Sequence, residues 1–232
     1  TRSVLYDYNG RTTTVTDPAG HISSKTVDAL GNVVTATDNG GTISYTYYSN
    51  GNPKTISTLG STITMEYDDY GRQKKLSDPD AGLTEYEYNA FGELVWQKDA
   101  RGNIYTIGYD VAGRISSKTG PEGTINYSYV ASGNGLEQIS GVTGPNSISK
   151  SFLYDAYSAV MQITENIEGS NFITQFEYDE YGNNTKTIYP SGFSVIRTFD
   201  NNGYLSQVKR GDNSQMIWQS EYINALGQVE QY

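Results

Sequence analysis

Residues 61–72, STITMEYDDYGR, contain the pattern that decides the fold of this chain. The apolar residues Ile63, Met65 and Tyr67 alternate with polar ones, which is the period of a half-buried β-strand. The stretch ends in Tyr-Asp-x-x-Gly-Arg, and aspartate and glycine favour a tight turn at these positions. The stretch therefore predicts a strand that runs directly into a turn.

The same phrase recurs along the whole chain, and its best copies begin at Tyr6, Tyr67, Tyr109 and Tyr178. Eleven copies can be anchored on the residue at the turn-glycine position: Gly10, Gly31, Gly51, Gly71, Gly92, Gly113, Gly133, Ser158, Gly182, Gly203 and Gly227. The first and last anchors are 217 residues apart over ten intervals, so the mean spacing is 21.7 residues. Self-similarity at such a period is typical of a repeat architecture.

A second short segment follows each anchor, such as residues 12–16, 33–37 and 94–98, and ends in a further turn. No stretch keeps a 3.6-residue period long enough to predict a helix. We therefore predict an all-β chain of tandem strand-turn-strand hairpins, each of about 21 residues. A lone hairpin is marginally stable, so neighbouring repeats should stack into one continuous twisted antiparallel sheet.

The register predicts one array over residues 1–232, with an enlarged loop near residues 130–151, where the spacing lengthens. The anchor Ser158 replaces glycine, so we expect its turn to avoid the left-handed backbone conformation. Both ends of the chain cut through the pattern. We therefore expect it to be a segment of a longer repeat protein.

Composition excludes several function classes. The 16 basic and 26 acidic residues give a net charge of −10, and no basic run is present, which argues against nucleic-acid binding. No apolar run approaches the roughly 20 residues that span a membrane. There are no cysteines, whereas 21 tyrosines can cover a thin wall with their rings and still reach polar partners.

The recurring Tyr-Asp-x-x-Gly-Arg phrase resembles the YD repeat of the Rhs (rearrangement hotspot) family, which includes bacterial polymorphic toxins, Tc toxin shell components, wall-associated proteins and teneurins. The resemblance implies a strip that spirals as part of a hollow shell or barrel. It also implies structural roles for the repeat positions, which are Tyr6, Asp7, Gly10, Arg11, Tyr67, Asp68, Gly71, Arg72, Tyr88, Gly92, Tyr109, Asp110, Gly113, Arg114, Tyr129, Tyr154, Asp155, Tyr178, Asp179 and Gly182.

By the same resemblance, the chain would be a non-enzymatic shell or scaffold segment of a large secreted or surface-exposed bacterial protein. Its partners would be the flanking repeats and an enclosed toxin or a surface partner. The open edges of the strip would favour self-association. In toxin members an Asp-Pro-x-Gly motif introduces a self-cleaving region. Here Asp17-Pro18-Ala19-Gly20 matches these four positions but not the Gly, Asn and Tyr positions that follow them in toxin members, so we interpret the segment as a repeat turn.

Two rival functions remain open at this point. Paired carboxylates such as Asp68 and Asp69 could serve a glycosidase, and Asp78 and Asp80 could bind calcium, but their repetition favours solvated faces and turn caps. His21 is the only histidine, and we expect it to be exposed and inert, so we predict no metal and no cofactor.

The second rival is a carbohydrate- or partner-binding module. Trp96 and Trp218 could stack on sugar rings if exposed, with Tyr105, Tyr157 and Tyr204 beside them. The alternative, that these rings face a neighbouring repeat, is the one we favour.

Overall fold

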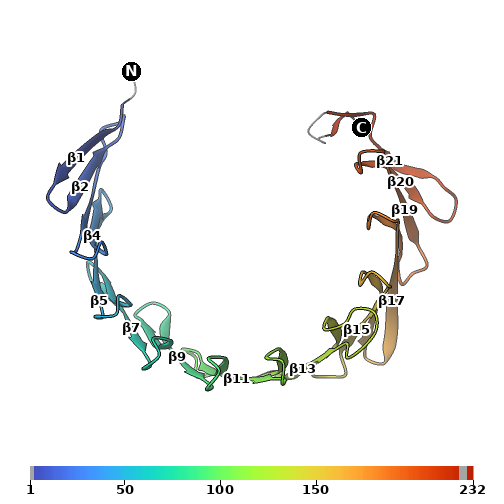
Figure 1. Cartoon of the computed structure of the whole chain (residues 1–232), viewed down its shortest axis with the longest axis horizontal. Coiled ribbons are helices and arrows are strands. Elements are labelled where there is room, and N and C mark those ends of the chain that lie inside the picture. The colour runs from blue at the N-terminus through green and yellow to red at the C-terminus, as the bar shows by residue number, and fades with distance from the viewer. Residues whose placement is uncertain (1–2, 225–228, 232) are drawn as a thin grey trace. The chain divides into compact units, whose positions relative to one another are not determined.

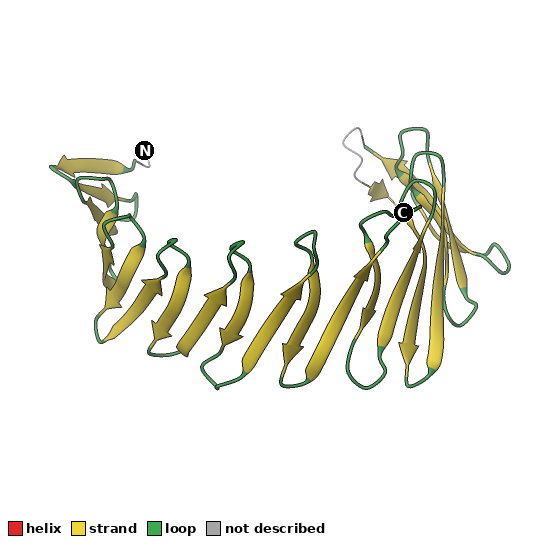
Figure 2. Ribbon diagram, turned by 60° about the horizontal axis from the view of Figure 1, so that its bottom comes forward, coloured by secondary structure: helices red, strands yellow, loops and turns green. Residues whose placement is uncertain are grey.

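The computed structural model describes residues 3–224 and 229–231, and every regular element in that part of the chain is a β-strand (Figure 2). The predicted all-β hairpin architecture is confirmed. The chain divides into two compact units, Thr1–Ile107 and Gly108–Tyr232. Figure 1 labels the strands of each unit in chain order.

The first unit is an antiparallel meander in which each strand pairs with the next one along the chain. Its strands are β1 (Leu5–Asn9), β2 (Thr12–Thr16), β3 (Ile22–Val27), β4 (Val33–Asp38), β5 (Gly41–Tyr47), β6 (Pro53–Thr58), β7 (Ser61–Tyr67), β8 (Gln73–Asp78), β9 (Gly82–Tyr88), β10 (Leu94–Lys98) and the first part of β11 (Ile104–Tyr109).

The second unit repeats this meander from β12 to β21. Its strands are β12 (Ile115–Gly120), β13 (Gly123–Tyr129), β14 (Ile139–Thr143), β15 (Ser149–Tyr154), β16 (Val160–Ile167), β17 (Ser170–Tyr178), β18 (Asn184–Ile188), β19 (Ser194–Phe199), β20 (Leu205–Arg210) and β21 (Met216–Gln219). A separate short hairpin joins β22 (Tyr222–Ile223) to β23 (Val229–Gln231).

A β-bulge recurs in the hairpins that contain the repeat phrase. Tyr47 pairs with Pro53 while Thr46 pairs with Thr55, so Lys54 is the extra residue. The same register shift lies at the end of β3, β7, β9, β13, β15, β17 and β19. A bulge bends its strand and increases the local twist, so each of these strands bends where the register shifts.

The two faces of the sheet differ in the first unit because cross-strand pairs share a face. One face carries Ile43 opposite Ala36 and Tyr45 opposite Ile56. The other carries hydroxyl pairs on neighbouring strands: Thr12 with Thr26 at 2.8 Å, Thr37 with Thr42 at 2.9 Å and Thr46 with Thr55 at 2.6 Å. The β-branched residues therefore both favour the strand and link it to its neighbour.

The wall has almost no conventional core. Among the residues whose burial is described, only Gly135, Val195 (8% exposed) and Thr187 (4% exposed) are buried. A single layer of sheet cannot enclose side chains between two layers, as most domains do. Backbone ladders, turn caps and contacts between adjacent hairpins must therefore provide most of the stability.

Two expectations need correction. The insertion near residues 130–151 is confined to the loop 130–138, because β14 and an ordinary hairpin turn occupy the rest. Ser158 does adopt the left-handed conformation, with φ of 66°. The predicted anchor Gly227 lies outside the described residues.

Candidate functional site: the repeat junctions

The repeat phrase forms a five-residue turn that is capped by its own aspartate. In the copy at Asp68, the Asp68 amide donates to the Arg72 carbonyl at 2.8 Å, and the Gly71 amide donates to the Asp68 carbonyl at 2.9 Å. Asp68 Oδ1 accepts the amides of Tyr70 and Arg72, both at 2.9 Å. Gly71 has φ of 79°, which glycine adopts without the strain that a side chain would add.

The same carboxylate cap recurs in turns at both ends of the strands. In each case Oδ1 accepts the amides two and four residues further on, as in an extended Asx turn. The capping residues are Asp17, Asp28, Asp68, Asp99, Asp110, Asp155, Asp179 and Asp200, and Asn89 does the same with its amide oxygen. The Asp17-Pro18-Ala19-Gly20 segment is thus a turn of this kind.

The fifth residue of the turn closes it through the second carboxylate oxygen. Arg72 Nε donates to Asp68 Oδ2 at 2.7 Å, and Asn103 Nδ2 donates to Asp99 Oδ2 at 2.9 Å. His21 Nδ1 lies 2.8 Å from Asp17 Oδ2. Arginine, asparagine and histidine therefore make the same contact with the capping carboxylate, because each places a side-chain nitrogen at the same point.

At six of these turns the hydrogen bonds favour the charged form of the carboxylate and lower its pKa: Asp17, Asp28, Asp68, Asp99, Asp110 and Asp179. The side-chain hydrogen bond from Asn103 is the largest cause of the lowered pKa of Asp99, and backbone and side-chain hydrogen bonds from Arg114 lower the pKa of Asp110. A hydrogen bond to a carboxylate stabilises the ionised state, so the shift has the expected sign. A general acid needs a raised carboxyl pKa, and these groups have the opposite tuning.

In five repeats, the tyrosine that ends the strand before the repeat turn reaches back to the preceding hairpin. The Tyr88 hydroxyl donates to the Gln73 carbonyl at 2.9 Å, and the Tyr178 hydroxyl donates to the Val160 carbonyl at 2.8 Å. Tyr47, Tyr129 and Tyr154 make the same contact with the carbonyls of Val33, Ile115 and Ile139. Each accepting carbonyl belongs to the first residue of the adjacent strand, beside the bulge.

Burial raises the pKa of the tyrosine hydroxyls at Tyr88, Tyr154 and Tyr178. They therefore stay protonated at neutral pH and can donate these hydrogen bonds. Burial raises the pKa of Tyr67 as well. The partner of its hydroxyl is different, however, because this hydroxyl lies 3.8 Å from Met65 Sδ and not beside a strand carbonyl.

The arginine of the phrase points forward to the next repeat. Arg72 Cζ lies 4.8 Å from the centre of the Tyr88 ring, and Arg72 Nη1 donates to the Asn89 carbonyl at 3.1 Å. Arg114 repeats this arrangement, with Cζ 4.2 Å from the Tyr129 ring. Where the phrase ends in arginine, as at Arg72 and Arg114, tyrosine and arginine thus connect neighbouring repeats. We call this set of contacts a repeat junction.

The first copy departs from this geometry. Tyr6 and Asp7 lie within β1, and Asn9 pairs with Thr12 across a two-residue turn. Tyr6 is 60% exposed and stacks on Tyr8 with centroids 6.5 Å apart. A good sequence match therefore does not by itself create a junction.

The junction around Ser158 is built differently. Ser158 Oγ accepts the Gly135 amide at 3.2 Å, and the Ser158 carbonyl accepts Gln138 Nε2 at 3.1 Å. Gly135 is buried against the ring of Tyr154. The loop 130–138 thus contacts the turn that lacks glycine. The two deviations from the repeat, noted separately in the sequence, form one structural feature.

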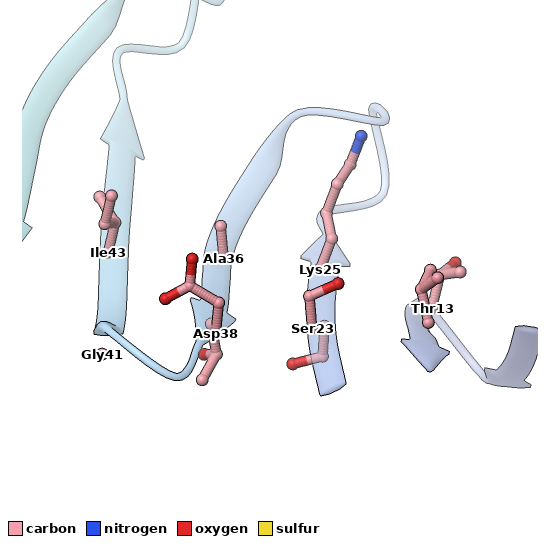
Figure 3. A pocket seen from close by; sticks show the side chains of 10 residues that line it. Thr13, Ser23, Lys25, Ala36, Asp38, Gly41 and Ile43 are labelled. Atoms are coloured by element: carbon pink, nitrogen blue, oxygen red, sulfur yellow. The ribbon is translucent and has the colours of Figure 1, made fainter. Parts of the chain in front are cut away.

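An open hollow of about 470 Å³ lies on the apolar face of the first unit (Figure 3). Thr13, Lys25, Ala36 and Ile43 occupy paired positions across four strands there. Small side chains stand where other hairpins carry larger ones. The hollow contains no aromatic ring and no pair of carboxylates, so it offers no evident catalytic chemistry.

The residues predicted for other chemistry are scattered. Trp96 and Trp218 are partly buried on β10 and β21, so their proposed glycan stacking stays a prediction. Asp78 Oδ1 accepts the amides of Asp80 and Ala81, and the part of the chain that the structure describes holds no group of three or more metal-binding side chains. Both carboxylate oxygens of Asp68 accept hydrogen bonds within its own turn.

Sequence reasoning identified the anchors but missed what two sets of residues do. The asparagines at the fifth turn position, Asn32, Asn103 and Asn183, are structurally equivalent to the arginines. The recurrence of Asp-x-x-Gly-Asn was the signal that could have shown this. Tyr47 was also overlooked as a junction residue because Tyr48 follows it in place of aspartate.

These features define a β-hairpin repeat protein whose distinctive residues cap turns and join neighbouring repeats. The RHS Repeat family model matches residues 6–43 and 88–125. These segments include five of the capped turns, which begin at Asp17, Asp28, Asn89, Asp99 and Asp110. Over these two segments the chain is similar to the RHS repeat family, which supports the YD/Rhs resemblance of the repeat phrase. No curated protein matches the sequence significantly.

Solved structures show the same fold. The crystal structure of TcdB2-TccC3-Cdc42 matches with a TM-score of 0.78, and TcdB2-TccC3 without its hypervariable C-terminal region matches with 0.80. Each is 15% identical in sequence and covers 98% of this chain, which spans only 14% of the matched chain. In the described residues, no helix is long and apolar enough to cross a membrane.

Proposed function

We propose that this chain is a wall segment of a larger, secreted or surface-exposed RHS-repeat protein that encloses or displays another polypeptide. The observation that carries the proposal is the repeat junction, in which Arg72 and Tyr88 connect neighbouring hairpins. Such a contact lets a one-layer sheet extend indefinitely without a second layer. The solved TcdB2-TccC3 structures, with the same fold, support the assignment.

The proposed role requires no catalysis by the segment itself. The turn carboxylates that could act as acids are held ionised by hydrogen bonds, as at Asp99 and Asp110. His21, the single histidine, is exposed and hydrogen-bonded to Asp17 within its turn. A wall made of repeated, equivalent polar groups serves enclosure better than it serves one reaction.

Protease protection in the intact protein that contains this segment tests the proposal. The wild type should shield the enclosed polypeptide from proteinase K. The double variant Arg72→Ala with Arg114→Ala should open two junctions and increase the cleavage rate at least several-fold. The matched control, Lys74→Ala with Lys209→Ala, removes the same charge outside the junction contacts. Equal protection in both variants, or no protected polypeptide in the wild type, would count against enclosure.

A further inference from the structure

We propose that the hollow between the turns 179–183 and 200–204 binds a neutral sugar ring that stacks on Tyr181. The hollow has a volume of about 690 Å³ and is lined by Tyr181 and Asn183 on one turn and by Asp200 and Asn202 on the next. This volume falls within the usual range of small-ligand sites. The proposal is independent of the enclosure function.

Tyr181 supplies the stacking surface. Its side chain is 83% exposed, like the aromatic residues at the same turn position in other repeats, so its ring is accessible to a ligand. Tyr181 differs from those residues because it lines a hollow. Asp179 Oδ1 accepts the Tyr181 amide at 3.0 Å, so the capped turn holds its backbone in place. The C–H face of a pyranose is apolar and matches an aromatic ring, whose phenolic edge can stay wet. A fixed backbone also lowers the entropy lost on binding.

Asp200 supplies an acceptor that the other turn in the hollow lacks. In the turn at Asp179, Asn183 Nδ2 donates to Asp179 Oδ2 at 3.0 Å. Asp200 Oδ1 accepts the amides of Asn202 and Tyr204, but the fifth residue here is tyrosine, and no described group donates to Asp200 Oδ2. This oxygen can accept a hydrogen bond from a sugar hydroxyl.

Asn202 completes the set of polar groups. Its backbone amide is used by Asp200, and no described residue bonds to its side-chain amide. An asparagine amide presents a donor and an acceptor side by side, which suits two adjacent sugar hydroxyls. An aromatic ring flanked by a carboxylate and an amide therefore offers the chemistry that a neutral pyranose needs.

The charges in the hollow favour a neutral ligand over an anionic one. Asp179 and Asp200 contribute two carboxylates. Arg197 is the one basic side chain in the lining, and its guanidinium already donates to Thr187 Oγ1 at 2.9 Å and to Asn184 Oδ1. The two carboxylates outnumber the one guanidinium, so a phosphate or a uronic acid would meet a lining of net negative charge.

Titration with neutral pentasaccharides tests the site, using cello-, malto-, manno- and chitopentaose as probes and an oligogalacturonate as the anionic comparison. Saturation-transfer NMR and calorimetry should show saturable binding of at least one neutral probe. Tyr181→Ala should weaken that binding by about tenfold or more, whereas Tyr181→Phe should retain most of it. Asp200→Asn should weaken it by several-fold.

Tyr157→Ala is the matched control, because Tyr157 is a 91% exposed tyrosine at the same turn position but outside this hollow. Circular dichroism of each variant checks folding, and the Tyr181→Phe variant keeps the test valid if alanine disturbs the turn. Binding that is lost equally in the control, that is confined to the oligogalacturonate, or that is seen for none of the neutral probes would overturn the proposal. So would a screen in which a peptide competes for the hollow while every sugar fails.

Discussion

The turn at Asp68 and the turn at Asp155 have the same backbone but join their neighbours in different ways. In both, the aspartate accepts the amides two and four residues further on. The first ends in Arg72, whose side chain reaches the next repeat, whereas the second ends in Ala159, whose side chain has no hydrogen-bond donor. Turn shape is therefore set by the aspartate, and coupling between repeats is a separate property.

At the second turn, the loop 130–138 provides the missing coupling. Gly135 and Gln138 bond to Ser158, and Arg114 from the repeat before donates to the Glu137 carbonyl at 3.5 Å. The loop thus accepts a hydrogen bond from Arg114 of the preceding repeat and donates hydrogen bonds to the turn at Ser158, which has no arginine. Experiments that disturb either region should show whether the two kinds of junction are energetically equivalent.

The largest effect is expected at Gly135, where the irregular junction is tightest. An added Cβ would overlap the ring of Tyr154, and the glycine φ of 74° is already unfavourable for any side chain. Gly135→Ala should therefore lower the free energy of unfolding of the second unit by about 3 kcal/mol. Urea denaturation followed by circular dichroism measures this change.

Gly133→Ala is the control for backbone strain alone, because its φ is 81° and no atom lies within 4 Å of the added Cβ. Its expected cost is about 1 kcal/mol. If the two variants lose the same stability, the Tyr154 contact contributes little, and the irregular junction is weaker than its geometry suggests.

A smaller effect is expected for the tyrosine hydroxyl, which both kinds of junction share. Tyr88→Phe and Tyr154→Phe each remove one hydrogen bond to a strand carbonyl, so each should cost about 1 kcal/mol. Tyr86→Phe is the control, since its hydroxyl has no hydrogen bond among the described residues, and its cost should stay within about 0.5 kcal/mol. A clear difference between Tyr88→Phe and Tyr154→Phe would show that the arginine strengthens the tyrosine bond in the regular junction.

The strands were predictable from the sequence because alternation and turn residues are local signals. Segments 12–16 and 94–98 coincide with β2 and β10. The junctions were less accessible, since Arg72 acts on a residue 17 positions away, and nothing local indicates that distance. Ser158 shows the limit of a residue preference: an aspartate cap and two contacts from another loop outweigh the strain of a left-handed serine.

The smallest expected effect is a gradual loss of stability in acid. The side-chain hydrogen bonds from Asn32, Asn103 and Asn183 are the largest cause of the lowered pKa values of Asp28, Asp99 and Asp179. A carboxyl whose pKa is lower in the folded state stabilises the fold above its unfolded pKa, near 4, and loses that contribution as the pH falls through the folded value. Melting temperatures should therefore drop between about pH 5 and pH 2.

The triple variant Asp28→Asn, Asp99→Asn and Asp179→Asn isolates this contribution. Asn89 shows that an amide oxygen can cap the same turn, accepting the Phe91 and Glu93 amides at 2.9 and 3.0 Å, so the fold should persist. The variant should melt slightly lower at neutral pH and lose less on acidification than the wild type. The control variant Asp69→Asn, Asp80→Asn and Glu180→Gln removes three carboxylates that cap no turn. If it flattens the pH profile equally, net charge rather than turn capping governs acid stability.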